Sequence, residues 1–149
     1  MKSLFEPATT EEVKQRMAHL RPESERQWGK MAPAQALAHL SLTIEVSVGL
    51  KFPPRNLLGR LIGRHVLNSF LAGKPFPRNS PTDKIYVVKD ERDFAAERQW
   101  LLELVDRFVG AGRGDSSKHV HSFFGPMTPQ EWAELNYLHL DHHLRQFGV

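Results

Sequence analysis

The sequence predicts an all-α fold, a bundle of helices that forms a single domain over residues 1–149. Apolar residues recur at helical spacing in three or four long segments, whereas no comparable segment alternates as a β-strand does. Hydrophobic residues make up 40% of the chain and charged residues 25%, which is usual for a globular protein. A chain of this length can bury a sizeable core without a second domain.

The first half of the chain contains two predicted helices. Thr9 and Glu12 have the spacing of a capping box, which predicts a short helix over residues 10–20. Pro33 suits the first position of a longer helix, which we expect to end near Gly49. This second helix is apolar on two sides. We therefore expect both sides to be packed against other segments, the second side against another helix of the chain or a second copy of the chain.

The middle of the chain is less regular. Residues 56–71 have helical spacing, although Gly59 and Gly63 weaken that prediction. A loop with three prolines follows, and residues 85–88 are too few to found a sheet, so we expect an extended connector there.

A third long helix is predicted over residues 91–109, capped by Asp90. The glycines at 110 and 112 are expected to end it. A polar loop should then occupy residues 113–118, before the last helix of the chain.

The last helix, residues 128–147, carries the clearest chemical signal. It opens with a capping box of Thr128 and Glu131. Winding it at about 100° per residue places His139 and His143 one turn apart on the apolar face. Two imidazoles at this spacing can bind one metal ion, as in zinc proteases, although a single buried histidine is more commonly a hydrogen-bonded core residue. His39, on the apolar face of the second predicted helix, is the candidate third ligand, and three protein ligands with an open position are typical of catalytic metal sites.

Five other polar residues are candidates for lining the pocket or supporting a ligand, with simple packing as the alternative. Gln35, Thr43 and Asn136 lie one turn from a proposed ligand, and His142 is next to His143. His121 precedes the apolar run that leads into the last helix, so we expect it near the mouth of the site.

The charge distribution is uneven. The net charge is only +3, but the segment from Lys51 to Lys84 holds seven basic residues and one acidic residue. Such a segment attracts an anionic ligand or nucleic acid, unless it is simply a solvated surface. No helix rich in Lys and Arg resembles a recognition helix, so we do not expect DNA binding.

Several classes of protein are excluded or disfavoured. The chain has no cysteine, which rules out disulfides, thiolate ligands and a cysteine nucleophile. Neither a signal peptide nor a membrane-spanning apolar run is visible, so we expect a cytoplasmic protein without a membrane anchor.

Four segments carry a family resemblance: RQWGKMAPAQALAHL, GKPFPRNSPT, HSFFGPMT and YLHLDHHLRQFGV. They resemble the DinB/YfiT-like metalloenzyme superfamily, and especially a bacterial branch classed as a domain of unknown function. The resemblance implies a four-helix bundle of up-down-down-up topology and a homodimer. It also implies a divalent metal, zinc or nickel, on His39, His139 and His143. Where the superfamily usually has the sequence HRGQ, this chain has HLRQ at residues 143–146. Where the branch usually has HPFFG, this chain has HSFFG at residues 121–125. Neither difference changes a proposed ligand.

A metal held by three neutral imidazoles keeps its positive charge, so it acidifies a bound water or thiol. Because the chain has no cysteine, a thiol nucleophile would come from a small cosubstrate, as the resemblance implies for a thiol-dependent transferase. Arg64, Lys74 and Arg78 are candidates to bind its carboxylates. The alternatives are a metal-dependent hydrolase and a non-catalytic metal-binding stress-response protein. No Glu is clearly aimed at the site to serve as the base that hydrolysis normally uses.

Overall fold

The computed structural model describes residues 1–115 and 119–149. Its helices, with one 3₁₀ turn (η1) and two very short strands, confirm the all-α prediction. Within the described residues the elements are α1 (Pro7–His19), α2 (Pro33–Ser47), α3 (Leu57–Leu71), η1 (Lys84–Tyr86), α4 (Phe94–Asp115), β1 (Val120–His121), β2 (Gly125–Pro126) and α5 (Pro129–Gln146). The strands form an antiparallel hairpin just before α5.

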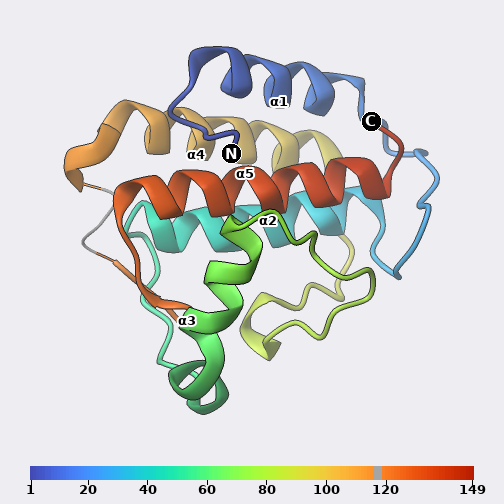
Figure 1. Ribbon diagram of the computed structural model, residues 1–149. Coiled ribbons are helices and arrows are strands. Elements are labelled where there is room, and N and C mark those ends of the chain that lie inside the picture. The colour runs from blue at the N-terminus through green and yellow to red at the C-terminus, as the bar shows by residue number, and fades with distance from the viewer. Residues whose placement is uncertain (116–118) are drawn as a thin grey trace.

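Four helices share one direction of axis. In Figure 1, α1, α4, α5 and α2 lie side by side, whereas α3 crosses them and projects from the lower side. The chain runs in one direction through α1 and α5 and in the opposite direction through α2 and α4. None of the described helices is both long and apolar enough to cross a lipid bilayer.

Helix α2 is the central helix of the fold. All its residues are buried except Ala34, Gln35 and Leu42, which are half-buried. Its two apolar sides pack against α4 and α5 of the same chain. The apolar character on two sides is therefore explained within one chain and does not itself require a second copy.

Two predicted helix starts are wrong. Helix α1 begins at Pro7, and Thr9 lies inside it, where its hydroxyl donates to the Glu6 carboxylate at 2.8 Å. Helix α4 begins at Phe94, because Asp93 rather than Asp90 accepts the backbone N–H of its first turn. Either aspartate suits a helix cap, and the three-residue difference changes which one fills that role.

The predicted end of this helix is also too early. Helix α4 continues past residue 109 to Asp115, with a kink at Gly112, whose φ is 63°. The predicted polar loop thus overlaps α4 at residues 113–115, and its remainder, 116–118, lies outside the described residues. The expected extended connector at residues 85–88 is only partly found: Ile85 and Tyr86 belong to the η1 turn, with the Tyr86 side chain buried, and Val87 after them is extended.

The glycines of α3 have a packing role. A Cβ atom on Gly59 or Gly63 would lie 2.4 or 2.1 Å from the Phe123 carbonyl oxygen in the β1–β2 turn. The absence of side chains at these two positions lets the helix approach the hairpin backbone. At its first turn, Asn56 accepts the Gly59 N–H at 3.1 Å and so caps the helix.

Candidate metal centre

Three histidines converge between α2 and α5. His39 comes from α2, and His139 and His143 come from successive turns of α5. The His139 Nε2 atom lies 3.0 Å from His39 Nε2 and 3.2 Å from His143 Nε2. One ring nitrogen from each residue lies within 4.8 Å of the others. The structure thus brings together the three residues that the sequence selected as metal ligands.

The other ring nitrogen of each histidine faces a hydrogen-bond acceptor. His39 Nδ1 donates to the Tyr86 carbonyl at 2.8 Å. His143 Nδ1 donates to Gln146 Oε1 at 2.8 Å, and this oxygen is identified because Gln146 Nε2 donates to the Trp28 carbonyl.

The Nδ1 atom of His139 also faces a hydrogen-bond acceptor. The Thr43 hydroxyl donates to the Leu40 carbonyl at 2.8 Å, so its oxygen accepts from His139 Nδ1 at 3.2 Å. A neutral imidazole has one N–H, and here each N–H is on Nδ1. All three Nε2 atoms therefore present lone pairs to one another with no proton between them.

The surroundings keep these rings neutral. Burial lowers the pKa of His39 below its ordinary 6.5. Burial, followed by the repulsion of His39, lowers the pKa of His143 to about 3. The pKa of His139 is also well below 6.5, because of burial and the neighbouring His143 and His39. At neutral pH the lone pairs are thus available to a cation without loss of a proton.

A family model described as "Protein of unknown function (DUF1569)" matches residues 3–148. The chain belongs to this family. No curated protein and no solved structure matches it.

The histidine cluster of the DUF1569 chain fits a transition-metal ion. Imidazole nitrogens bind zinc at about 2.0–2.1 Å, which places two of them about 2.8–3.4 Å apart for bond angles between a right angle and tetrahedral. The observed 3.0 and 3.2 Å separations match this range. Hydrogen bonds from the distal ring nitrogens to protein acceptors are the usual outer support of metal-bound histidines. Imidazole ligands suit zinc, nickel, copper and iron.

One side of the cluster is bordered by aromatic rings and a cation. The His142 ring centroid lies 5.0 Å from that of His143, 5.5 Å from that of Trp28 and 5.8 Å from that of Phe76. The Arg78 guanidinium lies 4.4 Å from the Trp28 ring centroid, and its charge contributes, after burial, to lowering the pKa of His142. His142 thus packs beside the cluster, and Arg78 lies over the Trp28 ring next to it.

Three other predicted pocket residues have partners elsewhere in the described chain. Gln35 binds the Ala32 N–H and the Asp90 carbonyl, and Asn136 donates to the Ser47 hydroxyl at 3.1 Å. Within the described residues neither side chain is hydrogen-bonded to the three ligand nitrogens.

His121 lies in the β1–β2 hairpin, where its Nδ1 accepts the backbone N–H groups of Phe123 and Phe124. Burial lowers its pKa to about 4. Its ring stacks near Tyr86, Phe124 and Trp132, so it organises the turn before α5.

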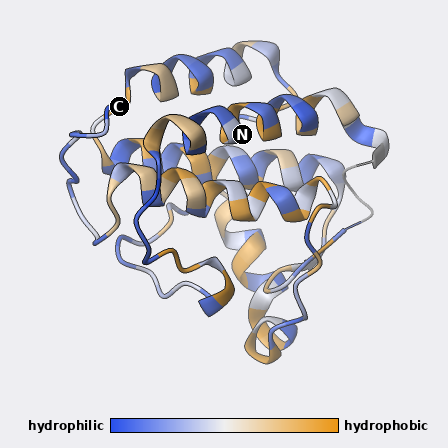
Figure 2. Cartoon of the chain, turned by 180° about the vertical axis from the view of Figure 1, so that it is seen from behind, coloured by the Kyte–Doolittle hydropathy of each residue, from blue (hydrophilic) through white to orange (hydrophobic). Residues whose placement is uncertain are grey.

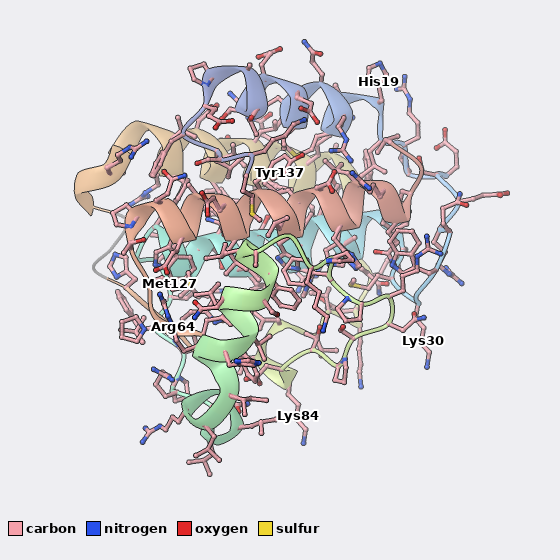
Figure 3. All side chains as sticks on the ribbon, viewed as in Figure 1. His19, Lys30, Arg64, Lys84, Met127 and Tyr137 are labelled. Atoms are coloured by element: carbon pink, nitrogen blue, oxygen red, sulfur yellow. The ribbon has the colours of Figure 1, made fainter. Side chains whose placement is uncertain are left out.

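The basic candidates are also separated. Arg64, labelled in Figure 3, pairs with the Glu131 carboxylate at the start of α5. Lys74 is exposed, and its side chain has no partner within the described residues. Of the three, Arg78 alone has a contact to a residue that borders the cluster.

Sequence reasoning missed two supporting groups. The Tyr86 carbonyl is a backbone atom, and no side-chain pattern identifies it. Gln146 shares the apolar face of α5 with the histidines, three residues after His143, and this spacing is the signal that identifies it.

Proposed function

We propose that this protein is a metal-dependent enzyme of the DinB-like kind, which transfers a small thiol to a small electrophile. In this proposal His39, His139 and His143 hold a divalent ion, zinc or nickel. The observation that carries it is the convergence of three Nε2 lone pairs whose Nδ1 positions are already hydrogen-bonded. Unshielded lone pairs at such short distances repel one another, and a cation between them removes the repulsion.

The order of the helices supports the DinB-like assignment. Along the chain α1 runs in one direction, α2 and α4 in the other, and α5 in the first again, which is an up-down-down-up order. Helix α3 is then an addition between α2 and α4. The ligand positions, one on α2 and two on α5, agree with those that the resemblance implies.

The chemistry follows from the donor set. An ion held by His39, His139 and His143 would keep its charge and an open coordination position, and it would lower the pKa of a thiol there enough to supply a thiolate nucleophile near neutral pH. Arg78 is the candidate to bind a carboxylate of the thiol cosubstrate, since it has no ion-pair partner within the described residues.

The thiol reaction is favoured over hydrolysis by the missing base. No carboxylate of the described residues joins the histidine group. The nearest acid along α5, Asp141, forms ion pairs with Arg16 at 2.8 Å and Arg145 at 3.0 Å. Hydrolysis by a metal-bound water normally uses such a carboxylate as the general base.

The first test is elemental analysis of protein purified without added metal. We expect one equivalent of zinc or nickel in the wild type, its loss in His39→Ala, and its retention in His142→Ala, the matched control. Wild-type protein that binds no zinc or nickel on titration would refute the metal site.

The second test is a panel of thiols, comprising glutathione, bacillithiol and mycothiol, assayed with a chromogenic aryl halide. We expect metal-dependent turnover with at least one thiol. Thiol-independent turnover of esters or amides would indicate the hydrolase instead. A metal-loaded protein without either activity would indicate a metal-binding protein that is not an enzyme.

A further inference from the structure

Exposed apolar side chains gather on one part of the molecule. Phe52, Leu57 and Leu61 are 74, 79 and 84% exposed. Most of the large apolar residues with exposed side chains fall within residues 50–87: Leu50, Phe52, Leu57, Leu58, Leu61, Ile62, Ile85 and Val87. Taking about 200 Å² for a fully exposed side chain of this size, they expose about 900 Å². The largest apolar patch of a typical monomer is only about 300–600 Å².

Half of this surface is a convex ridge on α3. The helix packs against the hairpin through Gly59 and Gly63, and its free face carries Leu57, Leu58, Leu61 and Ile62, which we call the α3 ridge. Figure 2 shows hydrophobic residues on α3, where it projects away from the other helices. Nothing in the described chain covers these four side chains.

Leu50, Phe52 and Ile85 line a concave surface. A groove of about 440 Å³ lies between Leu42 and Val46 of α2, residues 50–53, and Ile85 and Tyr86 of η1. Lys84 of η1 lies on the same side of the molecule as the projecting α3, as Figure 3 shows. The groove contains none of the three histidines and is apolar apart from Lys51, which is paired with Glu45 at 2.7 Å.

We infer that this surface is the interface of a symmetric homodimer, in which the α3 ridge of each copy packs into the groove of the other. One chain carries both a convex and a concave apolar surface. Two copies related by a twofold axis can therefore cover both at once in a closed assembly. The exposed apolar area also approximates the 800 Å² or so that each partner contributes to a stable interface. A lipid surface would take up the ridge but would leave the groove unfilled.

The experiment measures the mass of metal-free protein by light scattering after size-exclusion chromatography, so its outcome does not depend on the metal proposal. We expect a wild-type mass of twice 17.1 kDa. The Leu57→Glu/Leu61→Glu variant should run as a monomer with unchanged circular dichroism. The control is Ala18→Glu, which adds a negative charge at an exposed position of α1, on the opposite side of the molecule from α3; it should stay dimeric.

A pairwise complementation identifies the contact. Leu61→Glu alters the ridge and Phe52→Lys alters the groove, and each should be monomeric or weakly dimeric alone. Their mixture should associate more strongly than either, because one ridge and one groove then carry opposite charges.

A wild-type monomer at every concentration would overturn the inference, as would ridge variants that remain dimeric. A monomer that co-sediments with phosphatidylglycerol vesicles, and loses this binding in Leu57→Glu/Leu61→Glu, would assign the ridge to a lipid surface instead.

Discussion

Each histidine of the cluster donates to a different kind of acceptor, and only some of these acceptors can be replaced by mutation without changing other contacts. The Tyr86 carbonyl belongs to the backbone, and Gln146 also binds the Trp28 carbonyl, so changing it alters the loop around Trp28. Thr43 is the cleanest probe. Its hydroxyl meets His139 Nδ1 on one side and a carbonyl within its own helix on the other.

Replacing Thr43 with Val should weaken zinc or nickel binding about tenfold or more, because losing the outer hydrogen bond of a metal-bound histidine typically costs 10–100-fold in affinity. The measurement is competition with a chromogenic chelator. Thr43→Ser keeps the hydroxyl and should retain most of the affinity. Ser41→Ala removes a buried hydroxyl of α2 that has no hydrogen-bond partner among the described residues, and it should leave the affinity unchanged. Equal losses in Thr43→Val and Ser41→Ala would refute the orienting role of Thr43.

His121 should make the stability of the metal-free protein depend on pH. Unfolded, it takes up a proton near pH 6.5, but its burial lowers the pKa of the folded form to about 4. Between these values the unfolded state binds more protons, so the free energy of unfolding falls as the pH falls, by about 3 kcal/mol at most. Urea denaturation at a series of pH values measures the slope.

The comparison for this prediction is His121→Asn, whose side-chain oxygen can accept the same backbone N–H groups. The cluster histidines also have lowered pKa values and steepen the dependence in the same direction, but they do so in both proteins. The difference between the two slopes therefore isolates His121, and we expect it to approach one proton. Parallel slopes would show that His121 does not titrate in this range.

At the scale of single elements, α3 reverses the usual effect of a helical glycine. Replacing Gly by Ala inside a helix normally stabilises a protein by about 0.5–1 kcal/mol. At Gly63 the new Cβ would lie 2.1 Å from the Phe123 carbonyl oxygen, a backbone atom that cannot simply rotate away. We expect Gly63→Ala to destabilise the protein by about 1–3 kcal/mol. At Gly110 in α4 the added Cβ would meet no other described part of the chain within 4 Å beyond the neighbouring helix backbone, so Gly110→Ala should stabilise the protein, and urea denaturation midpoints report both. Stabilisation by Gly63→Ala would mean that α3 does not pack on the hairpin as described.

Patterns of residues close together in the sequence predicted some helix starts correctly and others wrongly. The capping box of Thr128 and Glu131 starts α5 as expected, because both hydrogen bonds join residues three apart. The start of α4 was misplaced because Asp90 and Asp93 are equally good local caps. Gly59 and Gly63 weakened the prediction of α3 because glycine is a poor helix former. Their packing role was not visible in the sequence because it depends on Phe123, about 60 residues later. Local patterns contain no information about such distant partners.

The same limit applies to the site as a whole. The three ligands were found from the sequence because each is a histidine on an apolar helix face, even though 100 residues separate His39 from His139. The Tyr86 carbonyl, 47 residues from His39, was not found, because every residue carries the same carbonyl. The apolar faces of α2 were predicted, but only the packed molecule shows that α4 and α5 cover them and that one face of α3 is left exposed.

Because the cluster joins α2 to α5, metal binding should stabilise the entire fold. A ligand that binds only the folded state at a hundred times its dissociation constant adds about 2.7 kcal/mol, which for a chain of this size raises the melting temperature by about 5–11 °C. Differential scanning fluorimetry with zinc or nickel, after removal of metal by a chelator, measures the shift. His39→Ala removes the only ligand on α2 within the group and should abolish it, whereas His142→Ala should shift as the wild type does. An equal shift in His39→Ala would mean that the metal binds elsewhere and does not link the two helices.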